Sequence, residues 1–444
     1  MSTRHFRTSL TVAAVLAAFA ACSGGENSSS SSSSTSSSSG AASGSSSSSS
    51  TGGSSSGQAS SSGSGSGSSG SSGSVDQARL ERYRRELPQM GWLEAPQPDP
   101  ASQSSGGQPL VGAPAEYPEH AKPIVQGING SVRFIIETLK AITDQQPTVY
   151  NSETLEFVWG PHENEDSAAP ANDKWMVYAK DEGTGADFRY TWAILRGIGN
   201  DTATYAPVIW GGANPDADES NDEYGSGVIL WDFEANFAWE EEHNPGHGDL
   251  DRGRYITLYA RGPDEQDATK VNTFVVAAFR NFIPRDNPTA QAADLDYLYG
   301  HVQATDHGFS FVDFNITGDI HTPATDGGTP STLQETLGLR LAFFNNGIGR
   351  GEARLTGGDV EAEGWTAGEG VECWGDNVER LYFELNAQGG DAGTVQVAKE
   401  GELTDCHDVF EQSLDALNIP SLADVPAEMM AALDAVATNG IPQE

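Results

Sequence analysis

The chain has 444 residues, a formal net charge of -39 at pH 7 and three cysteines. A surface this acidic repels phosphate backbones, which excludes nucleic acids as a favoured partner. Residues 23–74 are almost entirely Ser and Gly, and such a stretch lacks the apolar side chains that would offset the entropy of ordering. A folded core is therefore confined to the later part of the chain, which is long enough to bury one.

The first residues have the features of an export signal. Basic residues stand at positions 4, 5 and 7, and an apolar run extends from Leu10 to Ala20. At about 1.5 Å per residue, this run is too short to cross the roughly 30 Å hydrocarbon core of a bilayer. A basic tip followed by a short apolar run is typical of a secretory signal.

The sequence Phe-Ala-Ala-Cys at positions 19–22 resembles the lipobox of bacterial lipoprotein precursors. The resemblance implies that residues 1–21 are a signal peptide removed by signal peptidase II. Cys22 would then be the new N-terminus and the lipid attachment site. Phe19 departs from the usual Leu at its position, and ordinary cleavage near Ala21 is the alternative. Ser23, in place of Asp, implies the outer membrane by the lipoprotein sorting rule. We therefore expect a lipid-anchored cell-envelope protein with a periplasmic or surface-exposed domain.

Two linkers are expected between the anchor and the folded domain. Residues 22–74 form the lipid-attached Ser/Gly tether, with a root-mean-square span of about 40 Å for such a flexible chain. Residues 75–117 contain a short helix around Gln77–Glu86 and a Pro/Ser-rich linker from Ala95 onward. Long polyserine tracts also resemble the linkers of secreted polysaccharide-degrading proteins, a likeness of composition that fixes no activity.

Residues 118–444 are predicted to form one antiparallel β-domain with flanking helices. Val132, Ile135, Ile136 and Leu139 have helical spacing behind a candidate N-cap at Ser131. After this helix the apolar residues alternate with period two, which predicts about twelve strands without intervening helices. This pattern indicates a mainly β fold, either a sandwich or an up-and-down barrel.

Particular segments mark the course of this domain. The strands are expected to include Phe188–Ile194, Ile229–Phe233, Val271–Phe279, Leu337–Phe343 and Glu379–Asn386. Asn346-Gly347 between two extended runs predicts a hairpin. Pro426 after Asp424, followed by apolar residues at helical spacing and then Gly440, predicts a C-terminal helix.

The order of these elements is similar to that of uncharacterised bacterial envelope lipoproteins. The likeness covers residues 125–410 and includes Trp159-Gly160-Pro161 and a late Cys373-Trp374 strand. These relatives imply no particular activity. If Cys22 carries lipid, Cys373 and Cys406 remain as an even pair, and in an oxidising compartment a disulfide between them is expected. The alternative is two free buried thiols.

Two acidic loops are candidate metal sites. His243 and His247, four residues apart and followed by Asp249, are ligand types that suit zinc. Pro245 and Gly246 separate the two histidines, so we expect a loop between strands, and a solvated polar loop is the alternative. Asp216, Asp218 and Asp222 offer oxygen ligands for calcium, but their register does not fit an EF-hand. The sequence predicts no cofactor, with calcium left open.

Recognised catalytic motifs are missing from the sequence. Outside the Ser/Gly tract, where nothing holds a base beside a serine, it contains no G-x-S-x-G elbow, and it contains no P-loop motif. Nine tryptophans could build a sugar-binding platform, although their period-two placement favours core and strand-face positions. The interpretation is a binding or structural protein rather than an enzyme, with an envelope protein or polysaccharide as candidate partner. A tethered polysaccharide hydrolase and a calcium-dependent adhesion module are the alternatives.

Overall fold

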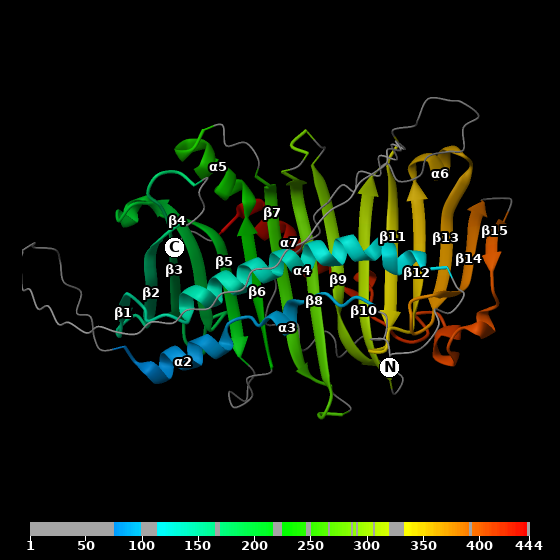
Figure 1. Cartoon of the computed structure of the whole chain (residues 1–444), viewed down its shortest axis with the longest axis horizontal. Helices are drawn as coiled ribbons and strands as arrows, with labels where there is room; N and C mark the ends of the chain where they lie inside the picture. The colour runs from blue at the N-terminus through cyan, green and yellow to red at the C-terminus, as the bar shows by residue number, and fades with distance from the viewer. Residues whose placement is uncertain are drawn as a thin grey trace, which may run out of the picture. The chain divides into compact units, whose positions relative to one another are not determined.

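The fold is a single antiparallel β-sheet with helices on one face and an irregular C-terminal segment on the other (Figure 1). The computed structural model describes residues 75–98, 113–164, 169–215, 224–245, 250–264, 267–285, 287–289, 292–304, 307–318, 333–389 and 393–441. Within these ranges fifteen strands pair in strict chain order, each with its sequence neighbours. The predicted mainly β, antiparallel class is confirmed, and the strands form one sheet rather than the two packed sheets of a sandwich.

The strands are β1 (Val149–Asn151), β2 (Glu156–Glu163), β3 (Asp173–Asp181), β4 (Tyr190–Ile198), β5 (Ala206–Pro215), β6 (Gly225–Asp232), β7 (Arg252–Pro263), β8 (Val271–Ile283), β9 (Ala293–Ala304), β10 (His307–Gly318), β11 (Glu335–Phe343), β12 (Gly349–Gly357), β13 (Trp365–Trp374), β14 (Arg380–Gly389) and β15 (Gly393–Glu400). The helices are α2 (Gln77–Glu86), α3 (Met90–Leu93), α4 (Glu116–Thr143), α5 (Phe233–His243), α6 (Gly358–Ala362) and α7 (Ala427–Asn439). No helix in the described part of the chain is long and apolar enough to cross a bilayer.

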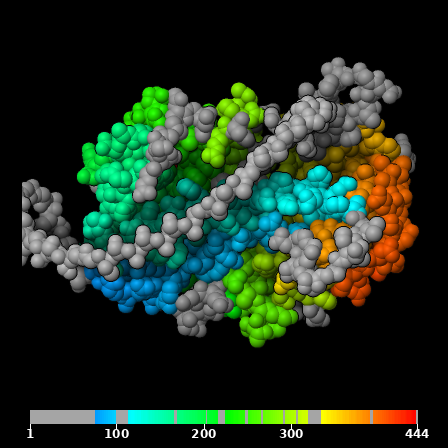
Figure 2. Space-filling model, viewed as in Figure 1, coloured from blue at the N-terminus to red at the C-terminus, as the bar shows by residue number. Residues whose placement is uncertain are grey.

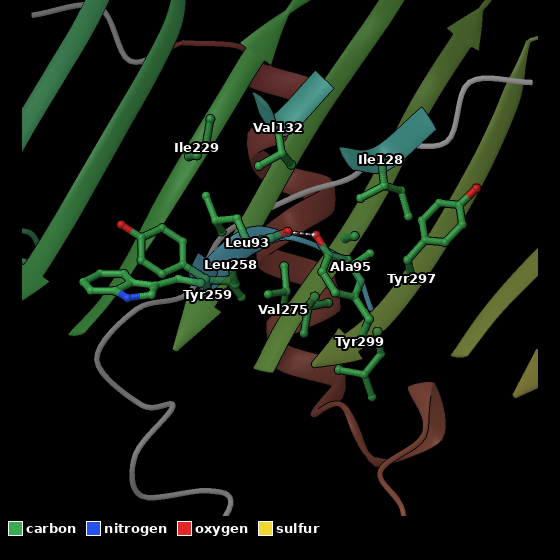
Figure 3. Close-up of a cluster of buried hydrophobic side chains, with 14 of the residues drawn as sticks. Leu93, Ala95, Ile128, Val132, Ile229, Leu258, Tyr259, Val275, Tyr297 and Tyr299 are labelled. Carbon is green, nitrogen blue, oxygen red and sulfur yellow. Dashed lines mark hydrogen bonds between the residues drawn. The ribbon is translucent and has the colours of Figure 1, made fainter. Parts of the chain in front are cut away.

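Helices α2, α3 and α4 pack on one side of the sheet, which we call the helix face (Figures 1 and 2). Helix α4 has 28 residues and is therefore about 42 Å long, which equals roughly nine strand spacings. Its buried positions Val125, Ile128, Val132 and Leu139 recur at helical spacing. Figure 3 shows Ile128 beside Tyr297 of β9, and Val132 nearer to Ile229 of β6.

Both ends of this helical layer are fixed by hydrogen bonds. The buried Glu372 of β13 accepts the N–H groups of Glu116 (2.9 Å) and Tyr117 (2.7 Å). A carboxylate at a helix N-terminus satisfies unpaired donors and complements the helix dipole. Past the other end of α4, Gln145 O accepts the indole N–H of Trp159 in β2 at 3.0 Å. Between them, Tyr299 donates its hydroxyl hydrogen to Leu93 O at 2.9 Å.

Residues 401–441, which we call the C-terminal strap, cover the opposite side, the strap face. The strap packs first against β14, then over β12 to β9, and ends with α7 on β8 and β7. Phe410 O accepts a hydrogen bond from the Arg350 guanidinium at 3.0 Å, and Leu422 N–H donates to Asp313 at 2.6 Å. Arg254 donates to the carbonyl of Thr438 at the C-terminus of α7 (2.8 Å), where the helix dipole favours a cation.

Several predicted elements are confirmed with close boundaries. The helix expected around Gln77–Glu86 spans those same residues, and the Asn346-Gly347 turn joins β11 to β12. The predicted C-terminal helix is α7, which ends before Gly440. Both terminal segments join the core, because Leu80, Leu93 and Leu433 are completely buried.

Three expectations were wrong. Helix α4 begins at Glu116, well before the predicted N-cap at Ser131, with Pro123 inside it. Helices α5 and α6 interrupt the strand series, which was expected to contain none. Phe233, expected to end a strand, is the first residue of α5, because the Asp232 side chain accepts Ala235 N–H and caps a helix there.

Candidate functional site

A group of apolar side chains on the strap face of β2–β5 is only partly buried. It lies beyond the part of the sheet that the strap contacts. We call this surface the open patch; it consists of Val158, Met176, Tyr178, Phe188, Leu195 and Trp210, all partly exposed. On the helix face of the same strands, Phe157, Val177 and Trp192 are fully buried. At this end of the sheet, the side chains on the helix face are therefore buried, whereas those on the strap face are partly exposed to solvent.

The register of the strands places the open patch in two parallel rows. The aromatic row runs directly across four strands and consists of Val158, Tyr178, Ala193 and Trp210. The polar row lies beside it and consists of Glu156, Lys180, Thr191 and Gly212. Paired residues in an antiparallel sheet point to the same face. The same line of paired residues continues across the sheet through Val228, Leu258, Val276 and Leu298 to Asp313. Because the strap contacts Asp313, the open patch and the strap lie on the same face of the sheet.

Two rings of the aromatic row stand on either side of a small residue. Tyr178 and Trp210 flank Ala193 and are two strands apart, or about 10 Å. The Tyr178 hydroxyl donates to Glu156 at 2.9 Å, which fixes the direction of its ring. The Phe188 ring lies edge-on to Trp210 with centroids 6.0 Å apart. It rests on Gly212, where a Cβ atom would come within 2.5 Å of the ring.

The charges around the open patch are neutralised in pairs. Lys174 contacts Glu163 at 2.8 Å, and Lys180 contacts Glu182 at 2.8 Å. Thr191 also donates its hydroxyl hydrogen to Glu182, at 3.0 Å. Each of the two ion pairs is balanced in charge, whereas Glu156 beside them accepts hydrogen bonds from the uncharged Tyr178 and Thr154. The polar groups of this surface can still exchange hydrogen bonds with a ligand.

The predicted Cys373–Cys406 disulfide is confirmed. The two Cα atoms are 5.9 Å apart, within the range that a disulfide bridges. Cys373 lies in β13, and Cys406 follows the first short turn of the strap. The disulfide therefore attaches the start of the strap to the sheet.

The histidine of the predicted zinc site lies in a different setting from the one expected. His243 is the last residue of α5, so it does not lie in a loop between strands. Its ring stacks on Trp239 with centroids 4.4 Å apart, and Nδ1 lies 2.8 Å from Trp239 O. His247 and Asp249 lie outside the described residues, as do Asp216, Asp218, Asp222 and Cys22. Within the described ranges, no three His, Cys, Asp or Glu side chains gather as metal ligands.

A buried charged cluster that we did not predict holds α5 against the sheet. Arg196 of β4 makes a two-pronged contact with Asp173 (2.7 and 3.1 Å) and also contacts Glu240 of α5. Its guanidinium lies 4.0 Å from the centre of the Trp239 ring. All four side chains are buried. Because the arginine is paired on both sides and stacked, the cluster explains the position of α5 and offers no reactive group.

A cleft of about 310 Å³ opens beside the end of α7. Arginines dominate its lining, but Arg252 is bound to Glu234, and Arg254 to Asp232 at 2.9 Å. Hydrogen bonding with Arg252 lowers the pKa of the Glu234 carboxyl. The cleft is therefore charge-balanced, and its arginines serve mainly to hold helices in place.

The most perturbed carboxyl group on the strap face is also structural. Burial raises the pKa of Asp313 to about 6, against the opposing effects of its hydrogen bond from Leu422 and of nearby Arg340. A carboxyl group with such a pKa can act as a catalytic acid when it faces a cleft. Asp313 lies under the strap and is only 5% exposed, so a substrate cannot reach it in this conformation.

Comparisons of this chain with protein-family models, with curated proteins and with solved structures give no match. Its function is therefore argued from its own residues. The open patch is the candidate site, because it combines exposed rings, a defined spacing and unburied polar neighbours.

Proposed function

We propose that the protein is a lipid-anchored protein of the cell envelope that presents its β-domain for binding, with the open patch as the binding surface. The binding role is inferred from the difference in burial between the two faces of the sheet at β2–β5. One face is sealed by helices, whereas the other leaves aromatic side chains partly exposed. Exposed apolar surface bordered by polar residues is typical of interaction sites.

The proposed location rests on two features of the cysteines. Cys22 follows a short apolar run and precedes the Ser/Gly tether, the arrangement of a lipidated N-terminus on a flexible linker. The Cys373–Cys406 disulfide supports export, because disulfides persist mainly in oxidising compartments. With Ser23 after the cysteine, the outer membrane is the proposed site of attachment.

Binding is preferred to hydrolysis because of what the buried carboxylates do. Asp173 is paired with Arg196, Glu372 with the first turn of α4, and Asp313 with the strap. A glycosidase needs two carboxyl groups facing each other across a cleft. These three groups each serve a different internal contact instead.

Replacing the cysteine tests the anchor. In Cys22→Ala the protein should move from the membrane fraction to the soluble fraction and lose incorporation of radiolabelled palmitate, because the thiol that carries the lipid is gone. Ser23→Ala, one residue further on, is the matched control and should remain in the membrane fraction. Retention of Cys22→Ala in washed membranes would show that the anchoring proposal is wrong.

A further inference from the structure

We infer that the open patch binds an extended, uncharged glycan chain, whose sugar rings stack on Trp210 and Tyr178. This inference rests on the proposed binding function and names its ligand class. It is carried by the spacing of the rings, by the polar row beside them and by the charge of the surface.

The spacing of the rings fits a chain of pyranose units. Tyr178 and Trp210 stand two strands apart, about 10 Å, which is close to the length of a disaccharide repeat in an extended β-linked glycan. Ala193, which pairs with both residues, is the small and largely buried residue between the two rings. Both rings lie in one row across neighbouring strands and on the same face of the sheet, so both can contact the same chain.

The polar row supplies hydrogen bonds at the edge of the sugars. Sugar rings present C–H groups on their faces and hydroxyl groups around their rims, so they need an aromatic surface and polar groups side by side. Glu156, Lys180 and Thr191 each lie two residues along their strand from a member of the aromatic row, on the same face of the sheet. Such a row of polar side chains is unlike the largely apolar centre of a homodimer interface.

The charge distribution excludes the charged alternatives to such a ligand. An acidic polymer would be repelled by a protein of net charge -39. A cationic polymer would find Glu163 and Glu182 already paired with Lys174 and Lys180, and Glu156 accepting hydrogen bonds from Tyr178 and Thr154. An uncharged glycan avoids both difficulties, because it exchanges only hydrogen bonds and ring contacts.

The test uses the full-length chain carrying Cys22→Ala, and cellulose, chitin, starch and soluble β-1,3-glucan as probes. We expect binding to at least one probe in pull-down or affinity electrophoresis. In that background Trp210→Ala should weaken binding about tenfold, as expected for a central aromatic contact. Tyr178→Ala should weaken it several-fold, and Tyr178→Phe should keep most of it because the ring remains. Phe134→Ala is the matched control: Phe134 is 50% exposed but lies on α4, over the helix face, and its loss should leave binding unchanged.

A second variant covers the case in which Trp210→Ala is poorly folded. Ala193→Arg places a long side chain between the two rings and should block the glycan while keeping both rings. Several results would overturn the inference: no binding to any of the four probes, binding unaffected by Trp210→Ala and Ala193→Arg, or binding only to an acidic polymer such as alginate. Dimerisation of the parent chain that Trp210→Ala abolishes in analytical ultracentrifugation would also overturn it, because a second copy would then cover the patch. In all these cases the fractionation of Cys22→Ala still tests the proposed lipid anchor independently.

Discussion

The strap face is divided into two halves that use the same sheet surface differently. From β7 to β14 it is covered by the C-terminal strap, and from β2 to β5 it carries the open patch. One row of paired residues runs through both halves, from Lys180 through Leu258 to Asp313 and Arg340. At the strap end these side chains bind backbone and side-chain groups of the strap. At the open end Lys180 and Thr191 contact the neighbouring Glu182 instead.

The difference shows what holds a chain segment on a sheet. The strap is irregular over much of its length, so its backbone groups need partners from the sheet. Glu352 accepts Leu414 N–H at 3.0 Å, Asp313 accepts Leu422 N–H, and Arg340 donates to Ile419 O at 2.8 Å. Each of these bonds satisfies a group that would be costly to bury alone. The open half offers rings and paired charges instead, which suit a separate ligand better than a covering segment.

The largest effect is expected in the covered half, for Phe410→Ala. Phe410 is fully buried and packs against Phe344 (centroids 4.8 Å apart) and Phe309. Removing a buried Phe costs roughly 3–5 kcal/mol through lost transfer energy and the cavity left behind. The free energy of unfolding measured in urea should fall by that amount. Phe410→Leu, which keeps most of the volume, should lose much less, and equal losses in the two variants would argue against tight packing under the strap.

The next effect concerns Asp313 and depends on pH. The ordinary Asp pKa is near 4, whereas burial under the strap raises that of Asp313 to about 6. The folded state therefore disfavours the ionised form, although Arg340 partly offsets this and Asp415 and Asp424 add to it. The unfavourable contribution is complete above about pH 6 and disappears as the pH falls toward 4, on the order of 2 kcal/mol in total.

Asp313→Asn should remove this pH dependence. Its side-chain oxygen can still accept the hydrogen bond from Leu422, and no charge is buried. We expect the variant to be more stable than the parent chain at pH 7.5 by about 1–2 kcal/mol, with the difference vanishing or reversing near pH 4. Urea unfolding of both proteins across this range measures it. Stability curves that stay parallel from pH 4 to 8 would contradict the raised pKa.

The sequence predicted the strands well because most of them show clear alternation. Strand β8 differs, because Val275, Ala277 and Phe279 point to the helix face and Val276 and Ala278 to the strap face, and all are buried in a continuous apolar run. Alternation identifies a strand, but it does not say which face is covered. That depends on α4, which precedes the strands in the sequence, and on the strap, which follows them. The local pattern likewise does not show whether the strands form one sheet or two.

The helix α5 shows how a helix cap can end an apparent alternation. Ile229, Trp231 and Phe233 continue an apparent alternation into the first residue of the helix. The signal that could have corrected this is Asp232, an N-cap residue followed by the helix formers Glu234 and Ala235. The buried Arg196 that holds α5 had no comparable signal, because its partners Asp173 and Glu240 are distant in sequence.

The candidate site was only partly foreseeable. The disulfide was predicted from cysteine parity and an expected oxidising compartment, and the tryptophans drew attention as a group. Nothing local separates Trp210, which is partly exposed, from Trp192 in the neighbouring strand, which is fully buried. Both occupy strand positions with apolar neighbours. They differ only in face, and the face is decided by segments far away in the chain.

The smallest effect is expected for Trp210→Ala, and it bears directly on the two halves of the strap face. Trp210 touches Phe188 edge-on and is partly exposed. Its truncation should therefore lower the free energy of unfolding by only about 1 kcal/mol, in the range of partly exposed positions, although the residue lost is larger than Phe410. Urea unfolding of the two variants in parallel gives the comparison. A loss for Trp210→Ala as large as that for Phe410→Ala would mean that the ring supports the fold rather than a ligand. A small loss, combined with the expected loss of glycan binding, assigns the ring to recognition, because a side chain that contributes little to stability is free to contribute its surface to a partner.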